Sequence, residues 1–275
     1  FLINFFKKYL NIYLTNSFYL ENSHLAMMMV AVFFSSLFIL LNKKRNNFLF
    51  LFLFATSFLI ILNNLSTTYF VSYFVSLVFL LIFFHKKLNF KFWIISILFL
   101  LVNSYLFLSD RNCTVKLTEF SGKDILEKNL EKRKNLTTQI YERSLMVSIE
   151  TLKYRPLGWG IDGMDNATFN FLDKPKIKKD LLKNEKVYHG LRLLNIKDGL
   201  SNFFKMITEF GIFVIVIFYF LIKYVLKIEN INSYNIFIIL LFISLCIRGV
   251  GYFSGGFVFC LLELLYLNKK INVSK

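Results

Sequence analysis

Long apolar runs alternate with short polar connections through most of the chain, and one long polar segment, residues 109–202, interrupts them. Several runs approach the ~20 consecutive apolar residues that a helix needs to cross a bilayer. The pattern predicts an all-α, polytopic helical membrane protein with one large extracytoplasmic loop that contains short helices. The expected membrane helices are 24–41, 48–62, 68–84, 92–108, 203–226, 235–253 and 257–267.

This pattern divides the chain into three parts. Residues 1–108 form N-terminal membrane helices, residues 109–202 form the loop, and residues 203–275 form C-terminal membrane helices with a short cytoplasmic tail. The opening run is interrupted by lysines and asparagines, so it fits a broken helix, an interfacial helix or the end of a preceding loop. Because the sequence begins at Phe1 without a recognisable leader, we expect further helices to precede it.

The composition agrees with a membrane protein. The chain is 56% hydrophobic and 19% aromatic, with 35 Phe and only 2 Pro, whereas soluble domains are about 45–50% apolar. Three cysteines without a CxxC pair or a His/Cys metal spacing predict neither a disulfide framework nor a zinc site. We therefore expect no metal and no cofactor.

The net charge of +16 is spread along the chain, which argues against nucleic acid as a partner. Many of the basic residues lie in short connections between apolar runs, as the positive-inside rule predicts for the cytoplasmic side. Counting crossings places four basic connections on that side and the long loop outside. These connections contain Lys43 to Arg45, Lys86 and Lys87, Lys223 and Lys227, and Lys269 and Lys270.

The centre of the loop predicts a helix followed by a sharp turn. Residues 142–154 carry Leu145, Ile149 and Leu152 at helical spacing, and the residue before Pro156 is disfavoured in the α region. The glycines that follow permit a tight turn. The plain alternative is a surface helix with an ordinary glycine stop.

Two motifs in and after this loop carry a resemblance to a known family. The first is an arginine followed a dozen residues later by Pro-x-Gly-x-Gly, and the second is Glu-apolar-Gly in the helix that follows the loop. Here they are Arg143 with Pro156, Gly158 and Gly160, and Glu209-Phe210-Gly211. Residues 143–266 thereby resemble the O-antigen polymerase/ligase family. The ligases carry a His-Asn/Ser/Gln pair where this chain has Leu200-Ser201, which favours a Wzy-type polymerase.

The resemblance implies polymerisation of undecaprenyl-diphosphate-linked oligosaccharide repeat units into O-antigen or a similar surface polysaccharide, on the outer face of the bacterial inner membrane. It also implies contact with membrane lipid and, as a further candidate partner, a chain-length regulator. Pro156, Gly158 and Gly160 would shape the loop. Without a metal, the departing diphosphate needs protein cations, and arginine pairs bidentately with phosphate oxygens. The candidate diphosphate-binding residues are Arg143, Arg155, Arg192 and Arg248.

Arg248 lies within the predicted span 235–253. Charged residues inside membrane spans are costly and are functional candidates by default. The alternative is that its long side chain reaches the headgroups from a helix end. The sequence leaves both interpretations open.

Three residues are candidates for the catalytic base. Asp198 and Glu209 share one helical face with Asn202 and Lys205, and such a polar stripe is expected to line a cavity. The alternative is a Lys205–Glu209 pair that only neutralises itself. His189 is the third candidate because its ordinary pKa suits proton transfer, although a single histidine in a lysine-rich loop is more often only solvated.

Three other functions remain open. An O-antigen ligase would transfer the glycan to a lipid or protein acceptor. A transporter or flippase of lipid-linked glycans would show internal repeats and polar residues in several spans, and neither is visible. A structural membrane subunit is the plainest alternative, against which the arginine-containing loop argues.

Overall fold

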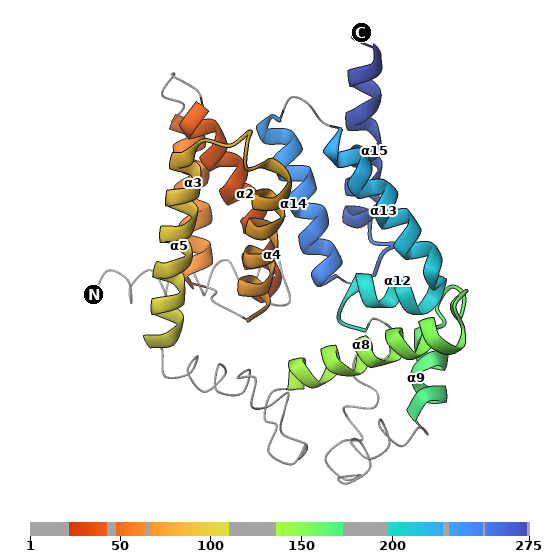
Figure 1. The fold of residues 1–275 in the computed structure, drawn as a ribbon. Coiled ribbons are helices and arrows are strands. Elements are labelled where there is room, and N and C mark those ends of the chain that lie inside the picture. The colour runs from red at the N-terminus through yellow and green to blue at the C-terminus, as the bar shows by residue number, and fades with distance from the viewer. Residues whose placement is uncertain are drawn as a thin grey trace. The chain divides into compact units, whose positions relative to one another are not determined.

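The computed structural model describes residues 22–42, 48–63, 67–109, 136–172, 197, 199–227, 231–249 and 251–273. These residues form ten helices and no strand, which confirms the all-α prediction (Figure 1). The helices are α2 (Asn22–Asn42), α3 (Phe48–Asn63), α4 (Thr67–Phe84), α5 (Phe90–Ser109), α8 (Leu136–Tyr154), α9 (Met164–Leu172), α12 (Asn202–Phe210), α13 (Ile212–Leu226), α14 (Ser233–Ile247) and α15 (Gly255–Val273). Over the described ranges, none of them combines the length and the apolarity that crossing a membrane requires.

The chain separates into two compact units. Unit 1 comprises residues 1–113, 226–247 and 259–275, and unit 2 comprises residues 114–225 and 248–258. Unit 1 contains α2 to α5, α14 and most of α15. Unit 2 contains α8, α9, α12 and α13 together with the connection 248–254.

Unit 1 is held together by aromatic packing around α2, which contacts α3, α4, α5 and α14. Phe33 of α2 stacks on Phe99 of α5 with ring centroids 4.2 Å apart, and Phe34 packs on Tyr73 of α4 at 4.9 Å. The buried Tyr73 hydroxyl donates to the Ser96 carbonyl oxygen over 2.9 Å, so its polar atom is satisfied. Burial of large aromatic rings contributes most of the stabilisation of such a core. The helices of unit 1 therefore coincide closely with the apolar runs of the sequence.

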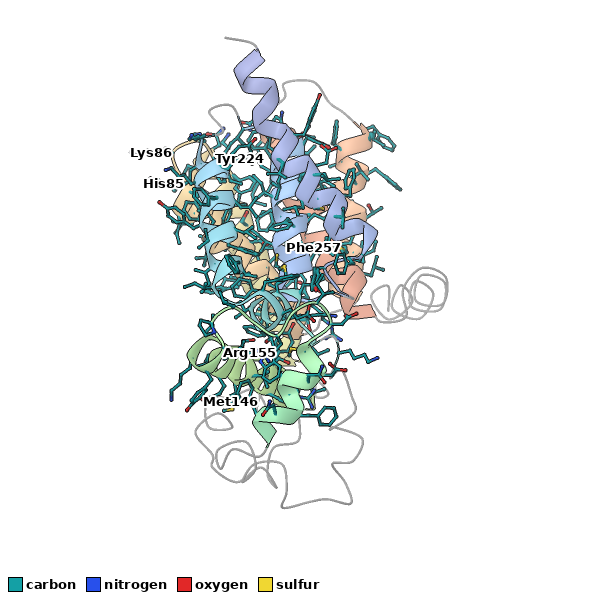
Figure 2. All side chains as sticks on the ribbon, turned by 90° about the vertical axis from the view of Figure 1, so that its right-hand side faces the viewer. His85, Lys86, Met146, Arg155, Tyr224 and Phe257 are labelled. Carbon is teal, nitrogen blue, oxygen red and sulfur yellow. The ribbon has the colours of Figure 1, made fainter. Side chains whose placement is uncertain are left out.

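The buried polar side chains of unit 1 are small and uncharged. The hydroxyls of Ser72 in α4 and Ser244 in α14 lie 2.8 Å apart and are hydrogen-bonded. The charged and titratable side chains of the turn between α4 and α5 are exposed, including His85 and Lys86 (Figure 2). This unit therefore holds its helices without buried charge among the residues that the structure describes.

The four membrane helices expected between 24 and 108 are confirmed as helices, α2 to α5, and their place in a membrane stays a prediction. The predicted span 235–253 is wrong at its end. Helix α14 ends at Ile247, and Arg248 begins a non-helical connection. Gly251 has a φ of +123°, and its N–H donates over 2.9 Å to the side chain of Asn202, 49 residues away in the sequence, instead of extending a helix. Arg248 thus lies outside the helix in which we expected it.

The predicted helix 203–226 is also wrong, because the structure breaks it at Gly211. Helix α12 ends at Phe210, Gly211 has a φ of +58°, and α13 starts at Ile212. The Ile212 N–H donates to the carbonyl oxygen of Pro156 over 2.8 Å, so a distant segment replaces the helical hydrogen bond. The break is therefore made by contact with the loop that precedes it.

In unit 2, α8 packs on α12 and α9. The loop helix predicted over 142–154 is confirmed and begins earlier, at Leu136. Its buried face carries small polar side chains and an arginine together with Ile140 and Val147. Of the apolar residues that predicted the helix, Leu145 and Ile149 are exposed and Leu152 is half-buried. Leu145, Met146 and Ile149 lie on the exposed face (Figure 2 labels Met146), and Arg143, Ser144, Ser148 and Thr151 are buried.

Candidate functional site

The two motifs that carry the family resemblance lie against each other in unit 2. The Pro-x-Gly-x-Gly loop is hydrogen-bonded to the Glu-Phe-Gly turn, although about 50 residues separate them in the sequence. Trp159 N donates to Thr208 O over 3.0 Å, Gly160 N to Glu209 O over 2.9 Å, and Ile212 N to Pro156 O over 2.8 Å. We call this pairing of residues 156–160 with residues 208–212 the motif junction.

Close backbone approach explains two of the glycines in the motif junction. Gly158 has a φ of +83°, and a Cβ atom there would overlap the carbonyl oxygen of Glu209. Gly211 has a φ of +58°, and a Cβ atom there would overlap the carbonyl oxygen of Pro156. Both positions therefore exclude side chains on two independent grounds, conformation and space. Gly160 has a φ of +84° but open space around it, so only its conformation favours glycine.

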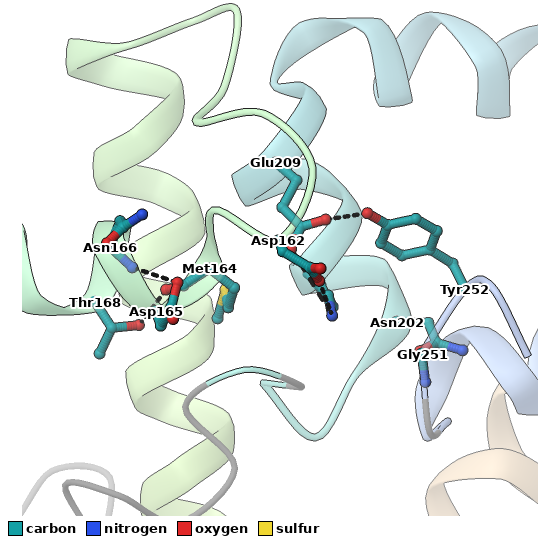
Figure 3. A network of polar contacts seen from close by, with 10 residues as sticks. Asp162, Met164, Asp165, Asn166, Thr168, Asn202, Glu209, Gly251 and Tyr252 are labelled. Carbon is teal, nitrogen blue, oxygen red and sulfur yellow. Dashed lines mark hydrogen bonds and ion pairs between the residues drawn. The ribbon is translucent and has the colours of Figure 1, made fainter.

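The motif junction holds Glu209 at the end of α12 in a buried position (Figure 3). Its Oε2 accepts a hydrogen bond from the hydroxyl of Tyr252, and its Oε1 lies 3.9 Å from Lys205 Nζ. Oε1 is buried and has no hydrogen-bond partner among the residues that the structure describes. Buried carboxylate oxygens are normally hydrogen-bonded, and Oε1 is an exception to this rule. It can therefore accept a proton or a hydrogen bond from a bound molecule.

Burial raises the pKa of Glu209 above its ordinary value of 4.5. The hydrogen bond from Tyr252, the charge of Lys205 and the backbone N–H of Asp162 oppose this rise, and the nearby Asp162 carboxylate adds to it. A carboxylate with a raised pKa is a stronger base than an ordinary one. The environment of Glu209 therefore suits proton acceptance.

The Lys205 ammonium group lies near Glu209 and near Asp162, which follows the Pro-x-Gly-x-Gly loop in the sequence. Its Nζ is 3.5 Å from Asp162 Oδ1 and 5.6 Å from the centre of the Tyr252 ring. Lys205 and Tyr252 are buried, whereas the Asp162 side chain is 84% exposed. The cation thus connects a buried carboxylate to a surface carboxylate.

Two side chains of α12 position the connection 248–254. Asn202 at the start of the helix accepts the Gly251 N–H, and Glu209 at its end accepts the Tyr252 hydroxyl (Figure 3). The two residues are seven positions apart on the helix, which corresponds to roughly 10 Å along its axis. Ser201 caps the same helix by accepting the Phe204 N–H. The buried polar face of α12 therefore fixes this connection at two points.

Helix α8 reaches α12 through hydroxyl groups. Ser148 Oγ lies 3.1 Å from Thr208 Oγ1 and donates to the Ser144 carbonyl oxygen over 2.7 Å. A buried apolar cluster joins α8 to α9, and Trp159 packs against this cluster. The cluster consists of Val147, Met164, Ala167 and Phe171.

The arginines take different positions. Arg143 is buried on α8, and burial lowers its pKa to about 10, so it stays protonated at neutral pH. Arg248 is also buried. Burial raises the pKa of Tyr141 on α8 to about 12, and the charge of Arg248 opposes this rise. Arg155 is exposed and stacks on Trp159, with its guanidinium carbon 4.5 Å from the ring centre.

The predicted site residues differ in where the structure places them. Glu209 is central, with Asn202 and Lys205 on the same buried helical face, which confirms the shared face but leaves the expected cavity a prediction. Pro156, Gly158 and Gly160 lie in the motif junction. His189, Arg192 and Asp198 lie outside the described residues.

Sequence reasoning missed Tyr252 and Asp162. The signal available for Tyr252 was its place beside two glycines after Arg248, and for Asp162 its place in the turn Asp-Gly. It also missed α9, whose buried Met164, Ala167 and Phe171 follow a helical spacing. Glu263, for which we had no expectation, accepts a hydrogen bond from Tyr234 over 2.6 Å in unit 1.

Over the described ranges, no group of three or more His, Cys, Asp or Glu residues is arranged to hold a metal ion. Comparison with family models, with curated proteins and with solved structures found no match to this chain. The geometry of unit 2 is therefore the basis for a functional proposal.

Proposed function

We propose that the protein is a membrane glycosyltransferase of the O-antigen polymerase type. Its substrates would be oligosaccharide repeat units linked to a polyprenyl diphosphate, and its product a surface polysaccharide. The observation that carries the proposal is the motif junction, in which two separated motifs of the resembled family pair through backbone hydrogen bonds and hold a buried carboxylate.

The chemistry follows from the environment of Glu209. The hydroxyl oxygen of the acceptor sugar attacks the anomeric carbon of the donor, while the bond from that carbon to the phosphate oxygen breaks. The hydroxyl proton passes to the Glu209 carboxylate, and the electron pair of the broken bond leaves with the diphosphate. A positioned base of this kind contributes about 10²–10⁴ in rate.

The buried arginines suit the stabilisation of the departing diphosphate. Arg143 and Arg248 carry charge in a desolvated environment, where electrostatic interactions are stronger than in water. Loss of one such charge is expected to reduce the rate by about 10²–10³. Arg155 offers a second kind of contact, since stacking on Trp159 leaves the edge of its guanidinium group available.

A polytopic membrane arrangement is part of this proposal. Large apolar side chains are exposed on helices of both units, and soluble proteins rarely expose extended apolar patches. On α5 they include Leu98 and Leu101, and on α13 they include Ile212, Phe213, Ile217 and Phe220. Accessibility of single cysteines introduced at these positions to a membrane-impermeant thiol reagent tests the arrangement, with protection expected.

The function is tested by complementation. A strain that lacks the gene receives the full-length wild type or the Glu209→Gln, Arg143→Ala or Arg248→Ala variant, and its surface polysaccharide is separated on a gel. We expect the wild type to restore a ladder of chain lengths and the variants to leave a single attached repeat unit, at unchanged protein level. Glu263→Gln, which changes a carboxylate of unit 1, is the matched control and should restore the ladder.

The product pattern separates the alternatives. A wild-type ladder in all three variants would contradict the proposed site. Complete loss of attached glycan, rather than loss of its length distribution, would contradict a polymerase and indicate a ligase or a flippase.

A further inference from the structure

Lys205 occupies a position between two carboxylates with different surroundings. Its Nζ is 3.5 Å from Asp162 Oδ1 and 3.9 Å from Glu209 Oε1. Both separations exceed the roughly 2.7–3.2 Å of an N–H···O hydrogen bond. The Lys205 ammonium group therefore lies at ion-pair distance from both carboxylates and beyond hydrogen-bond distance of each.

The two carboxylates differ in how easily they can be displaced. Glu209 is buried and fixed by Tyr252, whereas Asp162 is 84% exposed on the turn that the Gly163 N–H closes onto Gly160 O. Asp162 also has a φ of +56°, a conformation that few residues other than glycine, asparagine and aspartate adopt. Because Asp162 is the exposed partner of this pair, water solvates its carboxylate once it leaves Lys205, and a bound anion can replace it at little cost.

The second feature of the site is Oε1 of Glu209. Glu209 Oε1 is buried and accepts no hydrogen bond from the described residues, although Lys205 Nζ lies beside it. The site thus places a positive charge next to a buried carboxylate oxygen that accepts no hydrogen bond from the described residues. A ligand that presents a phosphate oxygen close to a hydroxyl group matches both.

We infer that Lys205 binds the diphosphate of the lipid-linked sugar, that Glu209 Oε1 accepts a hydrogen bond from the adjacent sugar hydroxyl, and that Asp162 occupies the anion position in the ligand-free protein. The inference rests on the proposed function and adds a fifth cation to the four arginines expected from the sequence. Lysine binds phosphate as a point charge, which suits a cation that must exchange one anion for another.

Binding to the purified full-length protein tests the inference without requiring polymerisation. Inorganic diphosphate and farnesyl diphosphate are titrated by calorimetry into wild type and into the Asp162→Asn, Lys205→Gln and Asp165→Asn variants. Asparagine tolerates the backbone conformation of Asp162. Asp165→Asn is the matched control, since it makes the same charge change three residues away, where the carboxylate accepts the Asn166 N–H over 2.8 Å.

The Asp162→Asn variant is expected to bind both probes about two- to fivefold more tightly than the wild type, because a competing ion pair is gone. The Lys205→Gln variant is expected to bind at least about tenfold more weakly, since a charge-assisted hydrogen bond is lost. Asp165→Asn should match the wild type. Tighter binding of farnesyl diphosphate than of inorganic diphosphate would identify the lipid carrier as the ligand, and equal binding would identify the free diphosphate.

Two results would overturn the inference. One is an Asp162→Asn affinity that equals that of wild type or of Asp165→Asn. The other is wild-type affinity in a Lys205→Gln variant that unfolds at a normal temperature. If the Asp162 and Lys205 effects are found but no polysaccharide ladder depends on Glu209, the binding site stands and the polymerase proposal fails, so the two failures are distinguishable.

Discussion

Units 1 and 2 bury different kinds of side chain. Among the described residues, the buried polar groups of unit 1 are serines, threonines and asparagines, and its core is aromatic. All of the buried charged residues in the described ranges belong to unit 2, namely Arg143, Lys205, Glu209 and Arg248. Because burying a charge costs free energy unless it is paired, the concentration of these residues makes unit 2 the candidate for the functional site.

The two units also differ in how their segments are joined. Unit 1 depends on side-chain packing, for which many apolar residues are interchangeable. Unit 2 depends on the motif junction, in which backbone contacts backbone and only glycine fits at two positions. We therefore expect unit 2 to be the more sensitive unit to small substitutions.

The largest effect is expected from adding one methyl group to the motif junction. Gly158→Ala and Gly211→Ala each place a Cβ atom on a backbone carbonyl oxygen at positive φ, and we expect each to destabilise the protein by about 3–5 kcal/mol and abolish activity. Thermal unfolding of the purified protein measures the loss. Gly160→Ala is the control, because its Cβ meets open space and only the backbone term of about 1–2 kcal/mol remains. Equal effects at all three glycines would contradict the junction.

A smaller effect is expected from Tyr252→Phe. The change leaves Glu209 Oε2 without its donor, and an unsatisfied buried acceptor costs about 1–3 kcal/mol. Because that hydrogen bond holds the pKa of Glu209 down, we also expect the pKa to rise further. The acid limb of the pH–rate profile should then move to higher pH. An unmoved limb in a folded variant would show that Glu209 is not the titrating base.

The pH dependence of stability provides a third test. Burial raises the pKa of Glu209 above 4.5, so the folded protein binds this proton more tightly than the unfolded chain. The stabilisation is fully present below the unfolded value and is lost as pH rises through the raised folded value. We expect Tm of the wild type to fall across this window and the Glu209→Gln variant to lack that part of the fall. Identical pH slopes in the two proteins would contradict the raised pKa, and Glu263→Gln serves as the control.

The smallest effect is expected in unit 1. Ser72→Ala removes one hydrogen bond between two small hydroxyls, which contributes about 0.5–1.5 kcal/mol. Activity should be unchanged, because the substitution leaves every buried charge of unit 2 in place. A loss of activity in a Ser72→Ala variant that stays folded at the assay temperature would place part of the functional site in unit 1.

Helices α2 to α5 of unit 1 were predictable because their apolar runs are uninterrupted and end in polar residues. The end of α8 at Tyr154 was predictable for an equally local reason, the proline two residues later. The break at Gly211 was not, because the sequence 203–226 is compatible with one helix and the break depends on the Pro156 carbonyl oxygen, about 50 residues away.

The candidate site shows the same limit. The helical spacing of Asn202, Lys205 and Glu209 was enough to predict that they share a face. The partners of that face were not predictable, since Tyr252 and Asp162 reach it from segments on either side in the sequence. Periodicity identifies residues on one helix, whereas a site assembled from three segments requires the tertiary structure.

The role of Glu209 is most directly measured by single-turnover transfer with purified full-length protein and a lipid-linked repeat unit. For Glu209→Gln we predict a rate lower than that of wild type by about 10²–10⁴, with an affinity for inorganic diphosphate no weaker than that of wild type, because the substitution removes the base and leaves Lys205 in place. Glu263→Gln should react at the wild-type rate. A Glu209→Gln variant that also transfers the repeat unit at the wild-type rate would contradict the assignment of this carboxylate as the base.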